Sequence, residues 1–373
     1  MLQLQELIDR DLDYLCRKGA DELAQLAGGH VWFTGGAGFL GYYLTLAIRH
    51  WNGSRAPGQR IRLTVLDNFI RGVPEWLSQL ESPEVRLRKH DVTQPIPSDL
   101  PPANWILHAA SIASPMYYRK HPLETIDANV DGLRLMLDYA RRRIDGGDAA
   151  AGPLSGVLFF STSEIYGDPT PDAIPTPETY RGLVSCTGPR ACYDESKRLG
   201  ETLCVIYAQH HGVPVSVARP FNNYGPGLKL TDGRVLPDFA RDALAGRDIV
   251  MLSDGTPTRT FCYVADALVG YLKVLVRGRR GEPYNIGIEK PEVSMRELAD
   301  LVVKHASALW GYQGRVVHKP SSESAYLTDN PNRRCPVIRK AREELDYAPE
   351  IDVDDGIGRT LNWYWFNRGG EAA

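Results

Sequence analysis

The sequence predicts a doubly wound parallel α/β sheet followed by a smaller C-terminal substrate-binding domain. Short apolar segments alternate with helical patterns between residue 30 and about residue 220. This alternation is expected of a parallel sheet with helices on both faces. A glycine-rich turn joins the first apolar segment to the first helical one. Beyond about residue 220 the alternation loosens, which indicates the smaller domain.

The chain divides into three predicted parts. Residues 1–29 form a helical extension, because a broken stripe of leucines runs through them. Residues 30–220 hold strands at 30–34, 61–66, 85–89, 104–107, 156–160 and 213–218, and helices at 42–50, 122–143 and 191–211. Residues 221–373 form mainly the substrate-binding domain, with helices near 236–245, 264–276, 295–310 and 355–365. Some segments there, such as 284–286, can return to the main sheet as strands.

Composition and charge exclude several classes of function. The chain is 43% hydrophobic and 24% charged, with a net charge of -3, so we expect a globular protein without a nucleic-acid or membrane partner. Its six cysteines and nine histidines show neither metal-ligand spacing nor a disulfide framework. We therefore expect no metal site, and a reducing cytoplasm as its compartment.

The glycine-rich turn spans residues 34–41 and lies between a strand and a helix. This order is the one that a dinucleotide diphosphate needs in a Rossmann sheet. Gly35 makes the tight turn, Gly38 lets the backbone approach phosphate, and Gly41 lets the helix pack on the strand. Phe39 and Leu40 lie in the same turn and are assigned to the cofactor with it.

The ends of the next strands complete the predicted cofactor site. Asp67 ends the second strand, where a carboxylate accepts the ribose hydroxyls of NAD and repels the 2′-phosphate of NADP. Arg71 lies close by and could offset that repulsion. The remaining residues assigned to the cofactor follow the second, third, fourth and sixth strands: Asn68, Asp91, Val92, Ala109, Ala110, Ser111 and Pro220.

Tyr193 and Lys197 form the predicted proton-transfer pair. Their i, i+4 spacing places both on one face of a helix, one turn apart. An ammonium group beside a tyrosine favours the phenolate, which can take a proton from an alcohol. The fifth strand delivers residues 161–164 at its carboxyl end, where ligands bind in an open parallel sheet.

Taken together and in this order, these motifs resemble those of the extended short-chain dehydrogenase/reductases. The motifs are the glycine turn, Asp67, Ser-Thr-Ser-Glu at 161–164, the Tyr193/Lys197 pair and Arg-Pro-Phe-Asn at 219–222. The resemblance covers roughly residues 30–365. It implies an enzyme of nucleotide sugars with tightly held NAD, usually a homodimer formed through the helices at 122–143 and 191–211.

Within that family, three local strings look most like the UDP-glucuronate decarboxylases. They are STSEIYGDP (161–169), GPRACYDESKR (188–198) and DGRV (232–235). Relatives that dehydrate a hexose place an aspartic acid before the glutamate, because expelling a hydroxyl requires an acid. Ser163 stands there instead and is a poor acid, whereas loss of CO2 needs none. Epimerases of the family usually lack Glu164.

The resemblance also assigns individual residues. Tyr193, supported by Lys197 and Thr162, takes the C4 hydroxyl proton while NAD accepts hydride, and the resulting ketone lets CO2 leave. Ser163 and Glu164 are included among the catalytic residues. Glu164 could donate a proton if burial raises its pKa, position a water, or crowd the substrate carboxylate. Four residues are assigned to the UDP-sugar, the third of them also to catalysis: Asn222, Arg234, Arg259 and Arg334.

Several alternatives remain open from the sequence. The product is UDP-xylose, a released UDP-4-keto-pentose, or both. Val337, which follows Pro336, departs from the usual family pattern, so the local helix cap near Arg334 is expected to differ. Residues 111–121 differ from the commoner decarboxylase form and lie near the cofactor and sugar, so the substrate or product could differ. Other readings are a nucleotide-sugar 4-epimerase or 4,6-dehydratase and, from another class, a non-catalytic NAD-binding sensor.

Overall fold

A seven-stranded parallel sheet forms the centre of the computed structural model, which describes residues 4–146, 152–320, 328 and 331–368. The strand order is β3-β2-β1-β4-β5-β6-β11. The strands are β1 (His30–Thr34), β2 (Arg62–Asp67), β3 (Val85–Lys89), β4 (Trp105–His108), β5 (Gly156–Phe160), β6 (Val215–Pro220) and β11 (Pro283–Ile286). This confirms the predicted fold class, and each of the six strands predicted for residues 30–220 is present within two residues of its predicted start.

Alternation along the central strands explains the two hydrophobic layers. On β1, Val31 and Phe33 pack into one cluster, while Trp32 between them packs into the other. β5 divides in the same way, with Leu158 and Phe160 on one face and Phe159 on the opposite face. Because both faces of a doubly wound sheet are covered, its strands are apolar at successive positions.

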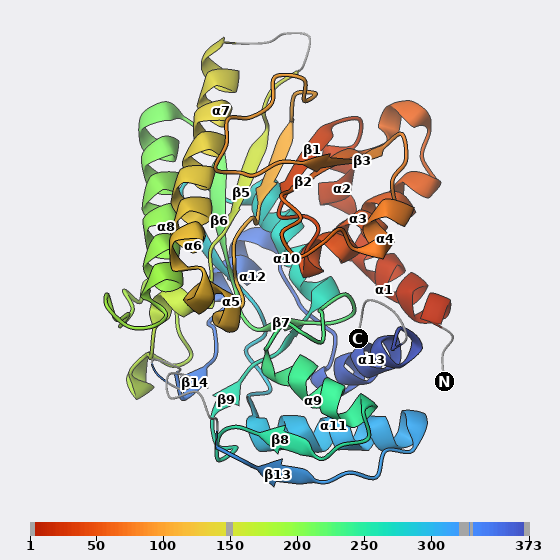
Figure 1. The fold of residues 1–373 in the computed structure, drawn as a ribbon. Helices are drawn as coiled ribbons and strands as arrows, with labels where there is room; N and C mark the ends of the chain where they lie inside the picture. Colours follow the sequence, from red (N-terminus) through yellow and green to blue (C-terminus); the bar gives the residue numbers. More distant parts are fainter. Residues whose placement is uncertain (1–3, 147–151, 321–327, 329–330, 369–373) are drawn as a thin grey trace.

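Helices α7 (Leu133–Gly146) and α8 (Ala191–His211) cover one face of the sheet, with α6 (Pro122–Asp127) beside α8 (Figure 1). The single helix predicted for 122–143 is interrupted by a π-helical turn at Ala128–Gly132. The wide turn directs the buried Asn129 toward α8, where its amide donates to the Ser196 hydroxyl at 2.9 Å. The π-helical turn, with this hydrogen bond to α8, divides a segment whose apolar pattern predicted one regular helix.

The opposite face is covered by α3 (Phe39–Gly53) and α10 (Val264–Arg277). The sequence analysis grouped α10 with the smaller domain, but the structure packs it against β5, β6 and α3. Twelve residues of this helix are buried, and a helix that is apolar nearly all round needs cover on every side. β11 then extends the sheet beside β6. Residues 264–286 thus lie with the sheet.

The predicted N-terminal extension consists of two helices, α1 (Leu4–Lys18) and α2 (Ala20–Leu26). α1 contacts α3, α10 and α13 (Val353–Phe366). Asp11 on α1 is fully buried and accepts from Tyr43 of α3 at 2.8 Å while it pairs with Arg359 of α13. The extension is therefore part of the core.

A smaller lobe lies below the carboxyl ends of the strands (Figure 1). It contains α9 (Val235–Leu244), α11 (Met295–Trp310) and α13, together with the paired strands β8 (Ile249–Met251) and β13 (Val316–His318). The two-residue strands β9 (Thr258–Arg259), β12 (Val293–Ser294) and β14 (Arg333–Arg334) form a second small sheet. Within the described residues, no helix is long and apolar enough to cross a bilayer.

Candidate functional site

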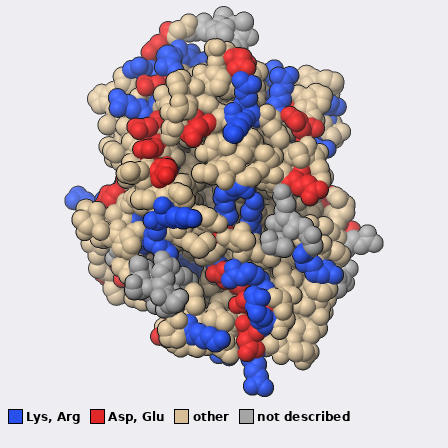
Figure 2. Space-filling model, in the orientation of Figure 1, with Lys and Arg blue, Asp and Glu red and all other residues tan. Residues whose placement is uncertain are grey.

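One cavity of about 680 Å³ opens between the carboxyl ends of the parallel strands and the lobe. Figure 2 shows the hollow at the middle of the molecule, with Lys and Arg side chains gathered beside it. It is lined by all the candidates named from the sequence except Gly41: Gly35, Gly38, Phe39, Leu40, Asp67, Asn68, Asp91, Val92, Ala109, Ala110, Ser111, Thr162, Ser163, Glu164, Tyr193, Lys197, Pro220, Asn222, Arg234, Arg259 and Arg334.

The glycine turn has the backbone shape that a dinucleotide requires. Gly35 has φ +70°, and a Cβ there would lie 2.7 Å from the Ala110 backbone. A Cβ on Gly41 would lie 1.8 Å from the Gly36 carbonyl oxygen, so only glycine lets α3 start against the turn. The N-terminus of α3, with Gly38 as its first flanking residue, opens into the cavity and suits a diphosphate.

Asp67 is held in place for the ribose. Its carboxylate accepts the backbone N–H groups of Ala37 at 3.1 Å and Phe69 at 2.8 Å. Arg71 pairs instead with Asp232 of the lobe at 3.2 Å. Because Arg71 is paired with Asp232, it is not placed to bind the 2′-phosphate of NADP. The residues present therefore fit NAD better than NADP.

Tyr193 and Lys197 lie in the first turns of α8, and both side chains are buried. The Lys197 ammonium donates to the Phe160 carbonyl at 2.7 Å and lies 5.9 Å from the centre of the Tyr193 ring. Burial raises the pKa of Tyr193 to about 12, although a hydrogen bond with Thr162 works in the opposite direction. The prediction that Tyr193 is easily deprotonated is therefore wrong for the protein without ligands. Burial, together with the charges of Glu164 and Asp194, outweighs the Thr162 hydrogen bond and the charge of Arg234.

Burial acts on Lys197 in the opposite sense and lowers its pKa to about 7. An amine with this pKa exchanges its proton near neutral pH. The buried Tyr193 phenol and the buried Lys197 amine thus lie one helical turn apart, and the amine is the one of the two whose pKa is near neutral.

Glu164 also lines the cavity, in a short 3-10 turn (Ser163–Tyr166) capped by Thr162. Its carboxylate contacts both Arg190 and Arg334, and an Arg334 Nη2 to Glu164 Oε2 distance is 2.6 Å. Burial alone would raise the pKa of Glu164, but the two guanidinium groups outweigh it and lower the pKa to about 2. Proton donation by Glu164 was conditional on a pKa raised by burial, and that condition is not met, because the two arginines keep the carboxylate ionised.

Arg190 is the main residue that the sequence analysis missed. It lies three residues before Tyr193, and its guanidinium contacts Glu164 on one side and lies 3.6 Å from Asp194 on the other. It lies within the string GPRACYDESKR (188–198). The i, i+3 spacing from Tyr193 was the signal available, since residues three apart on a helix share a face.

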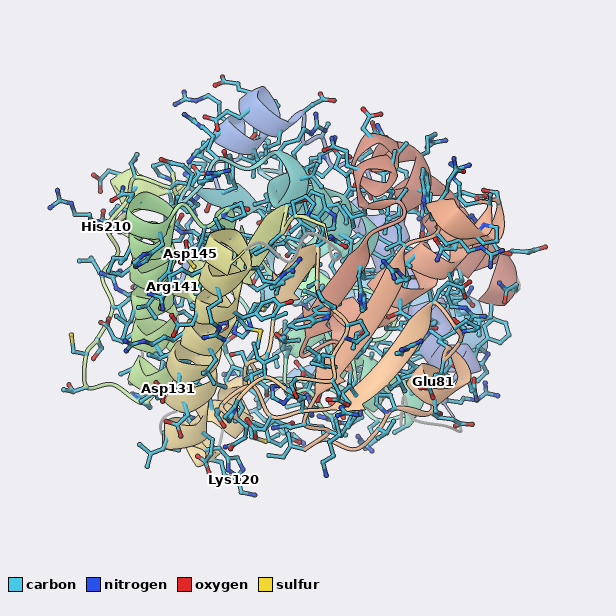
Figure 3. The ribbon with its side chains drawn as sticks, turned by 90° about the horizontal axis from the view of Figure 1, so that it is seen from above. Glu81, Lys120, Asp131, Arg141, Asp145 and His210 are labelled. Atoms are coloured by element: carbon cyan, nitrogen blue, oxygen red, sulfur yellow. The ribbon has the colours of Figure 1, made fainter. Side chains whose placement is uncertain are left out.

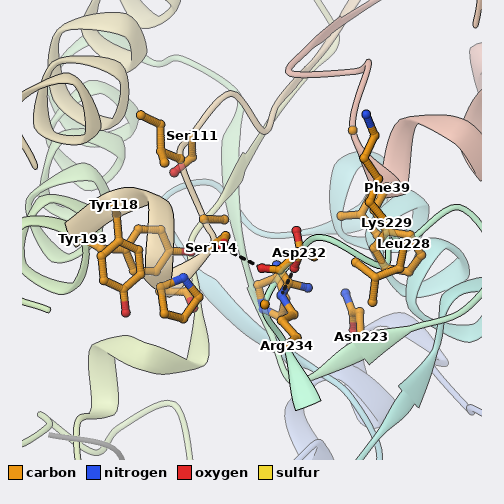
Figure 4. Close-up of a pocket in the computed structure, with 18 of the residues that line it drawn as sticks. Phe39, Ser111, Ser114, Tyr118, Tyr193, Asn223, Leu228, Lys229, Asp232 and Arg234 are labelled. Atoms are coloured by element: carbon orange, nitrogen blue, oxygen red, sulfur yellow. Dashed lines mark hydrogen bonds and ion pairs between the residues drawn. The ribbon is translucent and has the colours of Figure 1, made fainter. Parts of the chain in front are cut away.

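Tyr118 is a second missed residue. It lies on α5 (Pro115–Lys120), within the segment that departs from the common decarboxylase pattern. Its ring stacks on that of Tyr193, with centroids 5.1 Å apart and planes within 9°. Both phenols line the cavity (Figure 4). Stacking holds the Tyr193 ring in one orientation.

The other predicted substrate residues are held by protein partners. Arg259 donates to the carbonyl oxygens of Thr258 at 2.8 Å and Pro331 at 2.6 Å. The Asn222 amide donates to the Thr260 carbonyl at 3.0 Å, and Arg234 pairs with Asp232 at 2.9 Å. These contacts fix the side chains along the cavity wall before any ligand arrives.

The electrostatic result is a positively charged end of the cavity. Arg190, Arg259 and Arg334 act on the single carboxylate of Glu164. The crowding of cations is marked enough that burial and the charge of Arg334 lower the pKa of Arg259 to about 9. Three guanidinium groups outnumber the two carboxyl groups beside them, Glu164 and Asp194. This leaves an excess of positive charge, which suits an anionic ligand.

Comparison with known proteins gives three kinds of similarity. Residues 31–287 match the model of the NAD dependent epimerase/dehydratase family. The chain is 36% identical over 328 residues to UDP-glucuronic acid decarboxylase 3 of Arabidopsis thaliana, which covers 87% of this chain and 85% of that protein. It is 36% identical over 335 residues to UDP-glucuronic acid decarboxylase 1 of Xenopus tropicalis, which covers 89% and 71%.

Among solved structures, a dTDP-glucose 4,6-dehydratase from Streptomyces venezuelae with NAD bound superposes with a TM-score of 0.74. It is 25% identical and covers 91% of this chain and 98% of its own. The epimerase from Methanothermobacter thermautotrophicus gives a TM-score of 0.76 at 24% identity, with 94% and 96% covered.

Proposed function

This chain belongs to the NAD-dependent epimerase/dehydratase family, and from that premise we propose that it decarboxylates UDP-glucuronate with NAD as its cofactor. The observation that carries the proposal is the environment of Glu164. The carboxylate is kept ionised between Arg190 and Arg334, and the position before it is Ser163. The site thus lacks the acid that a dehydratase uses there and offers cations to a sugar that bears a carboxylate. The decarboxylase relatives support the same reaction.

The cofactor is held by the glycine turn and the ends of β2, β3 and β4. Backbone N–H groups at the start of α3 would hold the diphosphate, and Asp67 would accept from the adenosine ribose. When bound, NAD supplies reversible two-electron oxidation at C4 of the sugar. The small side chains of Ala109 and Ala110 leave the backbone open to the cofactor.

Proton transfer belongs to Tyr193, Thr162 and Lys197. Tyr193 takes the proton of the C4 hydroxyl, and Thr162 donates a hydrogen bond that stabilises the phenolate. The Lys197 amine takes up a proton when the phenolate forms, because a nearby anion favours the ammonium form. The ammonium then stabilises the phenolate. The stacked ring of Tyr118 holds the phenol in position.

Loss of CO2 takes place at the arginine end. The ketone at C4 stands β to the carboxylate, so the electrons of the breaking C5–C6 bond pass onto the C4 oxygen. We assign Arg259 and Arg334 to the sugar nucleotide and its carboxylate, and Glu164 to orienting Arg190 and Arg334. Protonation at C5 then gives a 4-keto pentose, which is reduced to UDP-xylose or released.

A homodimer formed through the helices of residues 122–143 (α6 and α7) and 191–211 (α8) is the proposed assembly. α6 and α8 carry exposed apolar side chains: Leu123 is 70% exposed, Leu199 47% and Ile206 42%. Figure 3 shows α8, with His210, beside α7 at one side of the sheet. Exposed leucines on adjacent helices are expected to be buried by a second copy. Size measurement of Leu199→Glu tests this: a monomer supports the interface, whereas an unchanged dimer contradicts it. Leu183→Glu, on a surface loop, is the matched control.

The proposed compartment is the cytoplasm. The six cysteines are free thiols in the structure, and reduced thiols are typical of that compartment. Cell fractionation with detection of the protein tests this.

The reaction is tested by incubating the protein with UDP-glucuronate and following CO2 and the nucleotide product by NMR and mass. We expect CO2 together with UDP-xylose, its 4-keto precursor, or both. Inversion at C4 without CO2 would instead identify an epimerase. UDP-glucose, which lacks the carboxylate, is the matched control and should give no product one carbon shorter. Tyr193→Phe tests the non-catalytic reading, because a sensor needs no phenol.

A further inference from the structure

Residues 227–234, here named the clasp loop, cross the cavity from the lobe to the cofactor half. On the lobe side, the Tyr364 hydroxyl donates to the Leu228 carbonyl at 2.6 Å, and Arg241 donates to the Leu230 carbonyl at 3.3 Å. At its start, Gly227 has φ +90°, and a Cβ there would lie 2.5 Å from the ring of Tyr42 on α3. The loop therefore packs directly against the helix that begins at the diphosphate position.

The other end of the clasp loop is tied to the cofactor half by Asp232. Its carboxylate, 8% exposed, pairs with Arg71 at 3.2 Å. The Ser114 hydroxyl donates to the Asp232 carbonyl at 2.7 Å, a contact drawn in Figure 4. The Arg71 guanidinium also lies over the ring of Tyr117 at 4.9 Å. Arg71 follows Asp67 by four residues, so these contacts join the lobe to the adenosine end of the cavity.

Lys229 lies at the centre of the clasp loop and is not explained by the sugar site. It lines the cavity together with Phe39 and Asp67, and Figure 4 shows it beside Phe39, the first residue of α3. Its charge acts on the Asp67 carboxylate. An ammonium group at this place faces both the start of α3 and the acidic residue assigned to the ribose.

We propose that the clasp loop retains the cofactor: Lys229 binds a diphosphate oxygen of the dinucleotide, and the Arg71–Asp232 pair keeps the loop closed over the adenosine end. The proposal rests on NAD being the cofactor. Lysine suits phosphate as a compact point charge. Where the 4-keto pentose is reduced in place, the cofactor is regenerated within the turnover, and a closed loop that slows its release keeps it available for the next one. The lobe thereby binds cofactor as well as sugar.

The first test measures NAD affinity in cofactor-free protein by calorimetric titration. For Lys229→Met we expect the dissociation constant to rise about tenfold to a hundredfold, as for loss of a charged hydrogen bond. The salt dependence of binding should also weaken. Lys229→Arg should stay close to the unmodified protein, as should Lys319→Met, which alters an exposed lobe lysine. Affinity in Lys229→Met within about twofold of the unmodified protein would overturn the role of Lys229.

The second test measures release of bound NADH by fluorescence after a chase with excess NAD. Arg71→Met and Asp232→Asn should each speed release about fivefold, and the double variant should be no faster than the faster single one, because the two residues act as one pair. Arg296→Met, which removes an exposed ion pair with Asp300 on α11, should leave release unchanged. Independent, multiplying effects of Arg71 and Asp232 would overturn the clasp. Neither test contains a sugar nucleotide, so neither outcome depends on which reaction the protein catalyses.

Discussion

Tyr193 and Glu164 line the same cavity, yet their surroundings have opposite effects. Around Tyr193 burial dominates: it raises the pKa of the phenol to about 12 and lowers that of Lys197 to about 7. Around Glu164 charge dominates, because Arg190 and Arg334 overcome burial and lower its pKa to about 2. The comparison teaches that one side of the site can move a proton, while the other side holds fixed charges against the substrate carboxylate.

Removal of the phenol should have the largest effect. Tyr193→Phe deletes the proposed base and keeps the ring that stacks on Tyr118, so turnover should fall about a thousandfold or more. Affinities for NAD and UDP should change less than about threefold, since binding groups remain. Steady-state kinetics and calorimetry check both. Turnover within about tenfold of the unmodified protein would assign the proton to another group.

Neutralising the fixed charge should have the next largest effect. Glu164→Gln leaves Arg190 and Arg334 without their carboxylate, and we expect kcat/KM to fall about a hundredfold. Because Glu164 does not titrate near neutral pH, the loss should be equal at every pH assayed. A pH-rate profile of the variant measures this. If activity instead recovered as the pH is lowered, Glu164 would be acting as a proton donor.

The pH dependence of kcat/KM should distinguish the Tyr193–Lys197 pair, which titrates, from Glu164, which does not. A phenolate with an ammonium carries as many protons as a phenol with a neutral amine. The reactive state therefore requires loss of one proton from the pair, which occurs as the pH rises through the Lys197 pKa of about 7. Below that value kcat/KM should fall about tenfold per pH unit.

Asp194 provides the control for that assignment, because its burial and the charge of Glu164 raise its pKa to about 7 as well. Asp194→Asn should keep the fall of kcat/KM below pH 7, whereas Lys197→Met should abolish it. If the fall of kcat/KM at low pH disappeared in Asp194→Asn, Asp194 rather than Lys197 would be the titrating group.

The smallest effect should come from the hydrogen bond to the phenol. Thr162→Val removes the hydroxyl that supports Tyr193, and we expect turnover to fall about tenfold, as for the loss of one hydrogen bond. Thr162→Ser keeps the hydroxyl and should be nearly unaffected. Equal losses in both variants would indicate that packing of the methyl group, rather than the hydrogen bond, is what matters.

The central sheet could be predicted because its signals are local. The strands from 30 to 220 are apolar at successive positions. Glycines 35, 38 and 41 lie where the backbone conformation or close packing favours glycine. By contrast, α10 was grouped with the lobe because its pattern shows that it is buried and does not show against what. The two-residue strands β9, β12 and β14 are too short to leave a pattern.

The site was predicted residue by residue, whereas its electrostatics were not. Glu164 lies 26 residues from Arg190 and 170 from Arg334 in sequence, so their contact depends on the fold of the whole chain. Without those arginines the sequence allows three roles for Glu164. In the same way, the burial that raises the pKa of Tyr193 depends on the fold of the whole chain. Residue types indicate possible chemistry, but the balance of burial and charge needs the assembled structure.

The central claim is that oxidation at C4 on the Tyr193 side precedes loss of CO2 on the arginine side. The most direct measurement compares single-turnover CO2 release from UDP-glucuronate with that from the same compound deuterated at C4. The account predicts slower CO2 release from the deuterated substrate, because the C4–H bond must break first. Identical rates of CO2 release from the two substrates, or no CO2 from either, would contradict it.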